Sequence, residues 1–141
     1  MAITFQSEDI DFPKIKKRKT SDWIKLVAKN YGREIGNISY LFCTDEKILE
    51  INRQYLQHDF YTDIITFDDS SGNKISGDIV ISIETVQSNS QKYQTSFQEE
   101  LHRVIIHGIL HLCGLNDKEE EEVKAMRKAE NAALELFEMG T

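Results

Sequence analysis

The sequence predicts an α+β fold in which one small mixed β-sheet packs against about five helices. Apolar and turn-forming segments follow the order strand, helix, strand, helix, two strands and three helices, which favours a single mixed sheet. The chain has 141 residues, enough for one domain with its own core, and contains no internal repeat, low-complexity segment or linker. We therefore expect residues 1–141 to form a single domain.

The first half of the chain alternates strands with helices. β-branched and aromatic residues mark the strands, and the polar pairs Ser21-Asp22 and Thr44-Asp45 are typical of helix starts. The predicted elements are a strand over residues 3–6, a helix from Ser21 to Gly32 with Trp23, Leu26 and Val27 on its apolar side, a strand over 35–43, and a helix from Asp45 to about Leu56.

The second half begins with two strands and continues with three helices. Residues 77–82 are almost all apolar, so that strand is expected near the middle of the sheet. Ser96 and Glu99 have the spacing of a capping box. The predicted elements are strands over 63–67 and 77–82 around a turn at 70–73, helices over 84–93 and 97–113, and a last helix from Asp117 or a neighbour with Val123, Met126, Ala129, Ala133 and Leu136 as its buried stripe.

The formal net charge of -7 argues weakly against a nucleic-acid partner. The charges are uneven, because five cations fall within residues 14–19 and an acidic run occupies residues 119–122. A local basic surface can bind phosphates even on an acidic protein. The acidic run is interpreted as a solvated helix surface.

No apolar run is long enough to span a membrane, and the N-terminus lacks the features of a secretory signal. These absences predict a cytoplasmic protein without a membrane partner. The two cysteines, Cys43 and Cys113, do not form a disulfide framework and are expected to be reduced and buried.

His107 and His111 are separated by one helical turn, so their imidazoles project from the same side of the predicted helix. Gly114 can adopt the left-handed conformation that ends a helix, and Asp117 follows within reach of the pair. Two histidines, one carboxylate and an open position are typical of a catalytic metal site. Such a site can activate a bound water, which favours hydrolysis.

The alternative interpretation is a pair of structural histidines that hydrogen-bond within the core. His102 lies roughly 140° around the helix from His107, and His58 falls in an expected loop. Both are therefore expected to be surface or secondary residues rather than ligands, and Cys113 is expected in the core.

Gly108 occupies the position after the first histidine, where the helix motif of metalloproteases has its catalytic glutamate. The protease hypothesis therefore lacks its general base. A glycine there instead allows something to approach the helix closely, either a substrate or a packed strand.

The segment from His107 to Gly114 closely resembles the signature of the YbeY family of bacterial rRNA maturation factors, which are single-strand-specific endoribonucleases. Other family-like segments occur in the expected order, and the resemblance runs from about residue 38 to the C-terminus. These segments are Asn52-Arg53-Gln54-Tyr55 followed by Asp59, Thr62-Asp63-Ile64-Ile65-Thr66-Phe67, and Gly77-Asp78-Ile79-Val80-Ile81.

The resemblance implies an α+β fold with a zincin-like metal-site helix and one zinc ion held by His107, His111 and Asp117. The family usually has a third histidine where this chain has Asp117, a change that adds negative charge and broadens metal choice toward harder ions. No catalytic residue is assigned beyond the metal-bound water.

Phosphate recognition departs from the family pattern. Leu56 stands where many members have an arginine thought to contact RNA phosphate. Arg53, His58 and Asp59 are the candidate substrate-binding residues.

Three functional hypotheses remain. The first is a metal-dependent endoribonuclease that matures the 3′ end of small-subunit rRNA and serves ribosome quality control, with rRNA and the ribosome, but not DNA, as partners. The second is a ribosome-associated assembly factor whose metal is mainly structural, which the net charge and Leu56 favour. The third is a hydrolase of small molecules or peptides, which Gly108 makes less attractive.

Overall fold

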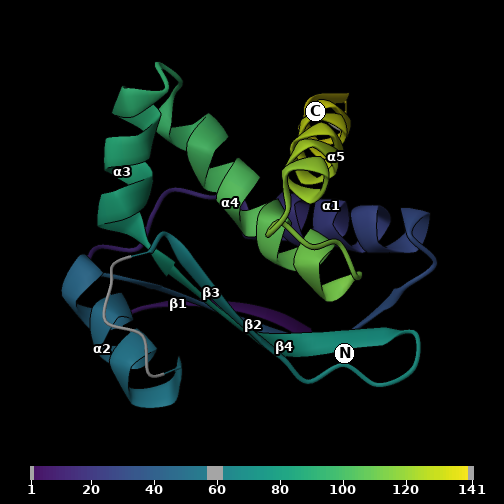
Figure 1. The fold of residues 1–141 in the computed structure, drawn as a ribbon, viewed down its shortest axis with the longest axis horizontal. Coiled ribbons are helices and arrows are strands. Elements are labelled where there is room, and N and C mark those ends of the chain that lie inside the picture. Colours follow the sequence, from purple (N-terminus) through teal and green to yellow (C-terminus); the bar gives the residue numbers. More distant parts are fainter. Residues whose placement is uncertain (1, 57–61, 140–141) are drawn as a thin grey trace.

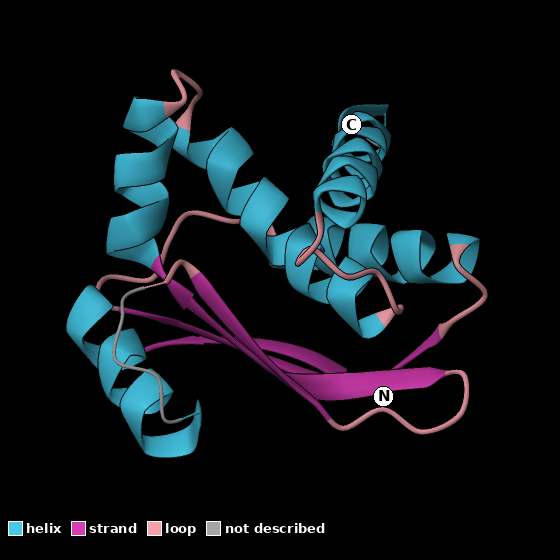
Figure 2. Cartoon of the chain, in the orientation of Figure 1, coloured by secondary structure: helices cyan, strands magenta, loops and turns pink. Residues whose placement is uncertain are grey.

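The computed structural model describes residues 2–56 and 62–139, and its elements follow the predicted order. Within these residues, five helices pack against a four-stranded mixed sheet (Figures 1 and 2), so the α+β prediction is confirmed. The elements are β1 (Ala2–Ser7), α1 (Lys17–Asn30), β2 (Glu34–Cys43), α2 (Asp45–Leu56), β3 (Ile64–Asp68), β4 (Lys74–Ser82), α3 (Ile83–Lys92), α4 (Phe97–Leu112) and α5 (Glu120–Met139).

β4 lies inside the sheet, as its apolar sequence predicts. The strand order is β1-β2-β4-β3, with β1–β2 and β2–β4 parallel and β3–β4 antiparallel. The connection from β3 to β4 turns at Gly72, whose φ of +63° favours glycine. This arrangement places the start of β3 beside the end of β4, where Ile64 pairs with Ile81.

The two faces of the sheet carry separate apolar layers, because alternate side chains of a strand point to opposite faces. The larger layer combines Tyr40, Phe42 and Ile79 of the sheet with residues of α1, α4 and α5. The smaller layer combines Ile65 and Val80 with residues such as Ile48 of α2. Figure 1 shows α4 crossing the sheet with α5 and α1 beyond it, while α2 lies at the opposite side.

α1 begins four residues before the predicted start at Ser21, so that boundary is wrong. Thr20 and Ile24 are fully buried, so the buried stripe of the helix extends toward its N-terminus. The indole of Trp23 also donates a hydrogen bond to the carbonyl of Ala133 at 2.7 Å, which fixes α1 against α5. Leu26, expected on the apolar side, is 44% exposed.

α4 carries the histidine pair and has the predicted caps at both ends. The Ser96 hydroxyl accepts a hydrogen bond from the Glu99 amide at 3.0 Å, although the Glu99 carboxylate accepts from Thr95 rather than completing the box. Gly114 has a φ of +106°, and its amide bonds to the His111 carbonyl at 3.0 Å. The predicted left-handed helix end is therefore confirmed.

Gly108 lies where α4 meets the sheet. A Cβ atom at this position would stand 2.9 Å from Cδ1 of Ile79 and 3.3 Å from Cδ1 of Ile64. The sequence left open whether a substrate or a strand packs against Gly108. The structure shows that two strands, β3 and β4, do so. This close packing holds the preceding helical residue, His107, beside the start of β3.

α5 begins at Glu120, three residues after the predicted Asp117, so Asp117 remains in the loop between α4 and α5. Met126 and Ala133 are buried as predicted, but Val123 is 48% exposed, because the first turn of α5 extends beyond the packed core. Among the described residues, no helix is both long and apolar enough to cross a membrane.

Candidate active site

A cavity of about 420 Å³ opens between α4, α3, α5 and the start of β3. Its walls combine imidazole, carboxylate and guanidinium groups with few apolar side chains. The lining residues are Thr62, Asp63, Ile64, Thr66, Asn89, Tyr93, Glu100, Arg103, Val104, His107, His111, Asp117, Arg127 and Glu130.

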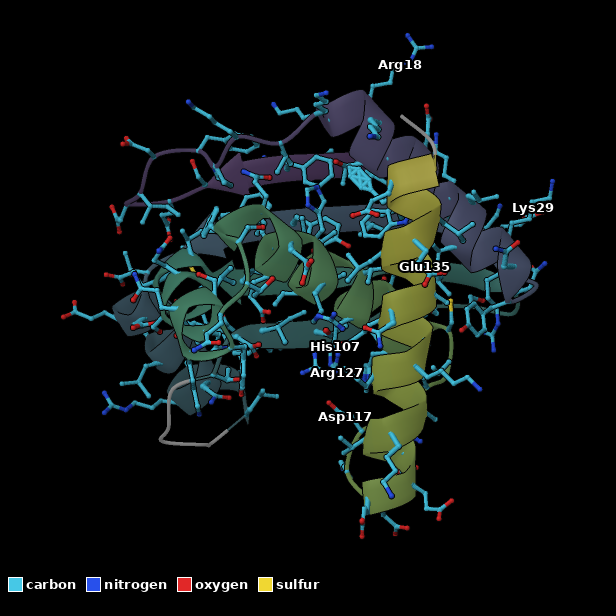
Figure 3. The ribbon with its side chains drawn as sticks, turned by 90° about the horizontal axis from the view of Figure 1, so that it is seen from above. Arg18, Lys29, His107, Asp117, Arg127 and Glu135 are labelled. Carbon is cyan, nitrogen blue, oxygen red and sulfur yellow. The ribbon has the colours of Figure 1, made fainter. Side chains whose placement is uncertain are left out.

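His107 stands between two carboxylates in this cavity. Its Nδ1 atom lies 2.7 Å from Oε2 of Glu130, and its Nε2 atom lies 3.2 Å from Oδ2 of Asp117. Figure 3 shows His107 and Asp117 beside the first half of α5, which carries Arg127. A hydrogen bond from Nδ1 to the Glu130 carboxylate orients the ring and directs Nε2 toward Asp117.

Glu130 contacts His107, Arg103 and Arg127, and its side chain is only 8% exposed. Its Oε1 atom lies 3.0 Å from Nη1 of Arg103 and 3.7 Å from Nη1 of Arg127. Burial opposes the ionisation of Glu130, but hydrogen bonds from His107 and Arg103 outweigh it and lower the pKa of this carboxyl. Glu130 is therefore an ionised acceptor at neutral pH.

The remaining titratable groups respond to burial and to these charges. Burial disfavours the protonated ring of His107, but the hydrogen bond and charge of Glu130, with smaller contributions from Asp117 and Asp63, raise its pKa. Burial raises the pKa of Asp63, which the nearby His107 partly offsets. Burial also raises the pKa of Glu100, partly offset by Arg103.

Of the three predicted ligands, the fold brings His107 and Asp117 together and places His111 on the wall of the same cavity. Over residues 2–56 and 62–139, no three His, Cys, Asp or Glu side chains converge closely enough to hold a metal ion. The ligand set therefore stays a prediction.

The donor chemistry nevertheless fits a divalent metal. Metal-binding histidines almost always donate their second ring N–H to a carboxylate, carbonyl or water, which is the arrangement of His107 and Glu130. The 3.2 Å separation between Nε2 of His107 and Oδ2 of Asp117 also matches the spacing of about 3.3 Å between two ligands of a tetrahedral zinc ion.

The predicted substrate contacts lie elsewhere or beyond the described residues. Arg53 is exposed on α2 and lines a separate hollow with Glu46, Leu49, Glu50 and Gln54. His58 and Asp59 lie outside the described residues.

Sequence reasoning missed five charged residues of the cavity, of which Glu130 offered the clearest signal. It follows Met126 by four residues and precedes Ala133 by three, so it interrupts the apolar stripe of α5. A carboxylate in a buried stripe requires partners. The other missed residues are Asp63, Glu100, Arg103 and Arg127.

A histidine-bearing helix lies across a mixed sheet, beside a polar cavity with an oriented imidazole and partly buried carboxylates. This arrangement is the one expected of a small α+β hydrolase. The chain matches the family model described as endoribonuclease YbeY over residues 2–138 and belongs to that family.

The curated relatives carry the same description. An endoribonuclease YbeY of Bacteroides fragilis is 62% identical over 96% of this chain and 98% of its own length. The endoribonuclease YbeY of Parabacteroides distasonis is 61% identical over 97% of this chain and 96% of its own length. One from Porphyromonas gingivalis is 48% identical over 96% of this chain and 90% of its own length. The solution structure of a Thermotoga maritima protein shares the fold, with a TM-score of 0.67 and 24% identity over 96% of this chain and 89% of that one.

Proposed function

We propose that this single-domain protein is a metal-dependent, single-strand-specific endoribonuclease of the cytoplasm. Its proposed task is maturation of the small-subunit rRNA 3′ end and ribosome quality control, with rRNA and the ribosome as partners. Membership of the endoribonuclease YbeY family supports the reaction class. The observation that carries the proposal is the orientation of His107 between Glu130 and Asp117 within an open polar cavity.

His107, His111 and Asp117 would hold the metal, for which zinc is the first candidate and another divalent ion the alternative. When bound, such an ion supplies a Lewis acid that lowers the pKa of a water and polarises a phosphate oxygen. Glu130 keeps the His107 ring in one orientation, and Arg103 keeps Glu130 ionised. These buried contacts organise the site before substrate arrives.

Arg127 is the cavity cation best placed to contact a phosphate. Its side chain is 54% exposed and its contact with Glu130 is long at 3.7 Å, whereas Arg103 is 15% exposed and bonds to Glu130 at 3.0 Å. Arg127 can therefore turn toward a phosphodiester without breaking a short ion pair. This role adds to the proposed contacts of Arg53, His58 and Asp59.

The test is cleavage of single-stranded and duplex rRNA fragments by protein with full metal occupancy. We expect cuts in the single-stranded fragment and loss of cutting in His111→Ala purified in parallel. Intact RNA, or equal cleavage by His111→Ala, contradicts the proposal. Metal content of Asp117→Ala tests the ligand set separately, because stoichiometric metal in that variant removes Asp117 from it.

An assembly factor with a structural metal is the second candidate. The favouring observation is that His107, Asp117 and Glu130 join α4, the following loop and α5, so a metal there would also bind these segments together. This alternative expects His107→Ala to lower thermal stability, and it expects a folded ligand variant without nuclease activity to keep its ribosome association. Loss of association in such a variant contradicts it.

A further inference from the structure

A strongly basic segment lies outside the candidate active site. Residues 14–19 hold five of the seventeen Lys and Arg residues of the chain and no carboxylate. In the described part of the chain, none of these five cations forms an ion pair with a carboxylate. The segment is therefore a local concentration of positive charge, without close ion pairs, on a protein whose net charge is -7.

This charge opposes the helix that carries it. α1 begins at Lys17, has no acidic residue in its first turn, and has Lys16 as an N-cap without a side-chain hydrogen bond. Each of the other four described helices has an acidic residue in its first turn. Because the positive end of a helix dipole repels cations, the basic segment does not serve the stability of α1.

Aromatic rings lie beneath the basic segment. Nζ of Lys19 stands 4.2 Å above the ring of Phe137, which stacks on Trp23 at 4.9 Å and contacts His102 at 4.3 Å between ring centroids. Two hollows of about 530 Å³ each flank Lys19 and Phe137. The hollows are lined by Lys14, Ile15, Lys16, Gln98 and His102 on one side, and by Arg18, Asp22, Trp23, Leu26 and Leu136 on the other.

The basic segment also lies close to the candidate active site. Phe137 follows Glu130 by seven residues on α5, which places it on the same side of the helix and about 10 Å further along. In Figure 3, Arg18 lies toward the C-terminal end of α5, and His107 and Asp117 lie beside its N-terminal half. A strand of a few nucleotides spans such a distance.

We propose that residues 14–19 and Phe137 form a second contact surface for the phosphate backbone of single-stranded RNA, outside the cavity that holds the reacting bond. Proteins that bind single strands without reading sequence combine a positively charged surface along the backbone with aromatic side chains. RNA as the occupant follows from charge complementarity and rests on the proposed function. This surface would anchor the strand despite the overall negative charge.

The experiment compares two double variants with equal changes in net charge. Lys16→Gln/Arg18→Gln removes two exposed cations of the surface, and Lys25→Gln/Lys29→Gln removes two exposed cations from the same helix beyond it. Binding to a phosphorothioate single-stranded RNA of about twelve nucleotides, which resists cleavage, is measured at several salt concentrations. We expect the first variant to bind about tenfold more weakly, with a salt slope lower by about 1.4, and the second to retain the wild-type slope.

Equal slopes in all three proteins, equal losses in both variants, or no binding by the wild type would overturn the proposal. Cleavage of unmodified RNA by the wild type is measured in parallel. If the three proteins bind RNA in the expected pattern but the wild type never cuts it, the nuclease function is contradicted and the proposed contact surface is not. If the wild type cuts RNA while both variants bind like the wild type, only the contact surface is contradicted.

Discussion

Nδ1 of His107 and Oε2 of Glu130 lie 2.7 Å apart, in a contact that joins α4 to α5 in the wall of the polar cavity. The two residues are separated by 23 positions in the chain, so the contact depends on how the helices pack. It determines which nitrogen of His107 faces Asp117.

Glu130→Gln should weaken zinc binding by about tenfold or more, because the variant keeps an oxygen acceptor for His107 but loses the charge that strengthens the histidine as a ligand. Competition with a chromophoric chelator measures the affinity. Glu135→Gln, an exposed change on the same helix, should bind zinc like the wild type. Unchanged affinity in Glu130→Gln would mean that this contact does not tune the site.

Gly108→Ala should destabilise the protein by about 1–3 kcal/mol, because the new methyl group presses on Cδ1 of Ile79 at 2.9 Å in a packed core. Urea unfolding measures the loss. Adding Ile79→Val removes that Cδ1 atom and should recover part of the loss, although Ile79→Val alone costs about 0.5–1.5 kcal/mol. Strictly additive losses in the double variant would show that the two groups do not collide.

His102 should make the folded protein sensitive to acid. Burial lowers its pKa below the ordinary 6.5, a shift that Lys19 reinforces and the hydrogen bond to the Gln98 carbonyl opposes. The unfolded chain therefore takes up this proton first. The stability that the neutral ring contributes is fully present above pH 6.5 and is lost as pH falls from 6.5 through the folded-state pKa.

His102→Phe keeps an aromatic ring against Phe137 and Trp23 but removes the titration. The free energy of unfolding, measured in urea at pH 7 and near pH 5, should therefore fall less with acid in the variant than in the wild type. The other titrating groups are common to both proteins and cancel in the comparison. Parallel pH profiles would exclude His102 as a source of acid sensitivity.

Both cysteines should be unreactive in the folded protein. Burial, with the charge of Glu8, raises the pKa of Cys43 to about 12, and burial also raises the pKa of Cys113. Since the thiolate is the reactive form, a disulfide reagent at pH 8 should label neither residue until urea unfolds the chain. Rapid labelling of the native protein would indicate that one of these thiols is accessible.

The order of elements could be predicted from local sequence, because strands and helix ends have short-range signals such as the Gly114 turn. Two details could not be predicted from local sequence. The start of α1 depends on Thr20 and Ile24 packing in a core formed by distant segments, and the exposure of Val123 depends on where α5 leaves that core. Tertiary packing overrides local preference at both positions.

The candidate site was predictable only where its residues are close in sequence. His107, His111 and Asp117 lie within eleven positions, and the structure places them around one cavity. Asp63 lies just before β3 and Glu130 lies on α5, so only the packing of these segments against α4 brings them to His107. The one local signal for Glu130 is that it interrupts the apolar stripe of α5 between Met126 and Ala133, a signal that sequence reasoning missed.

The position of Glu130 on α5 also affects when the cavity is completed during synthesis. Protein synthesis proceeds from the N-terminus, so the sheet and α4 emerge before α5. Until α5 docks, His107 and Arg103 lack the hydrogen-bond acceptor that Glu130 supplies to both. The growing chain thus forms α4, with its histidines, before the cavity is organised. An enzyme proposed to cut ribosomal RNA therefore completes its cavity only after α5 has left the ribosome.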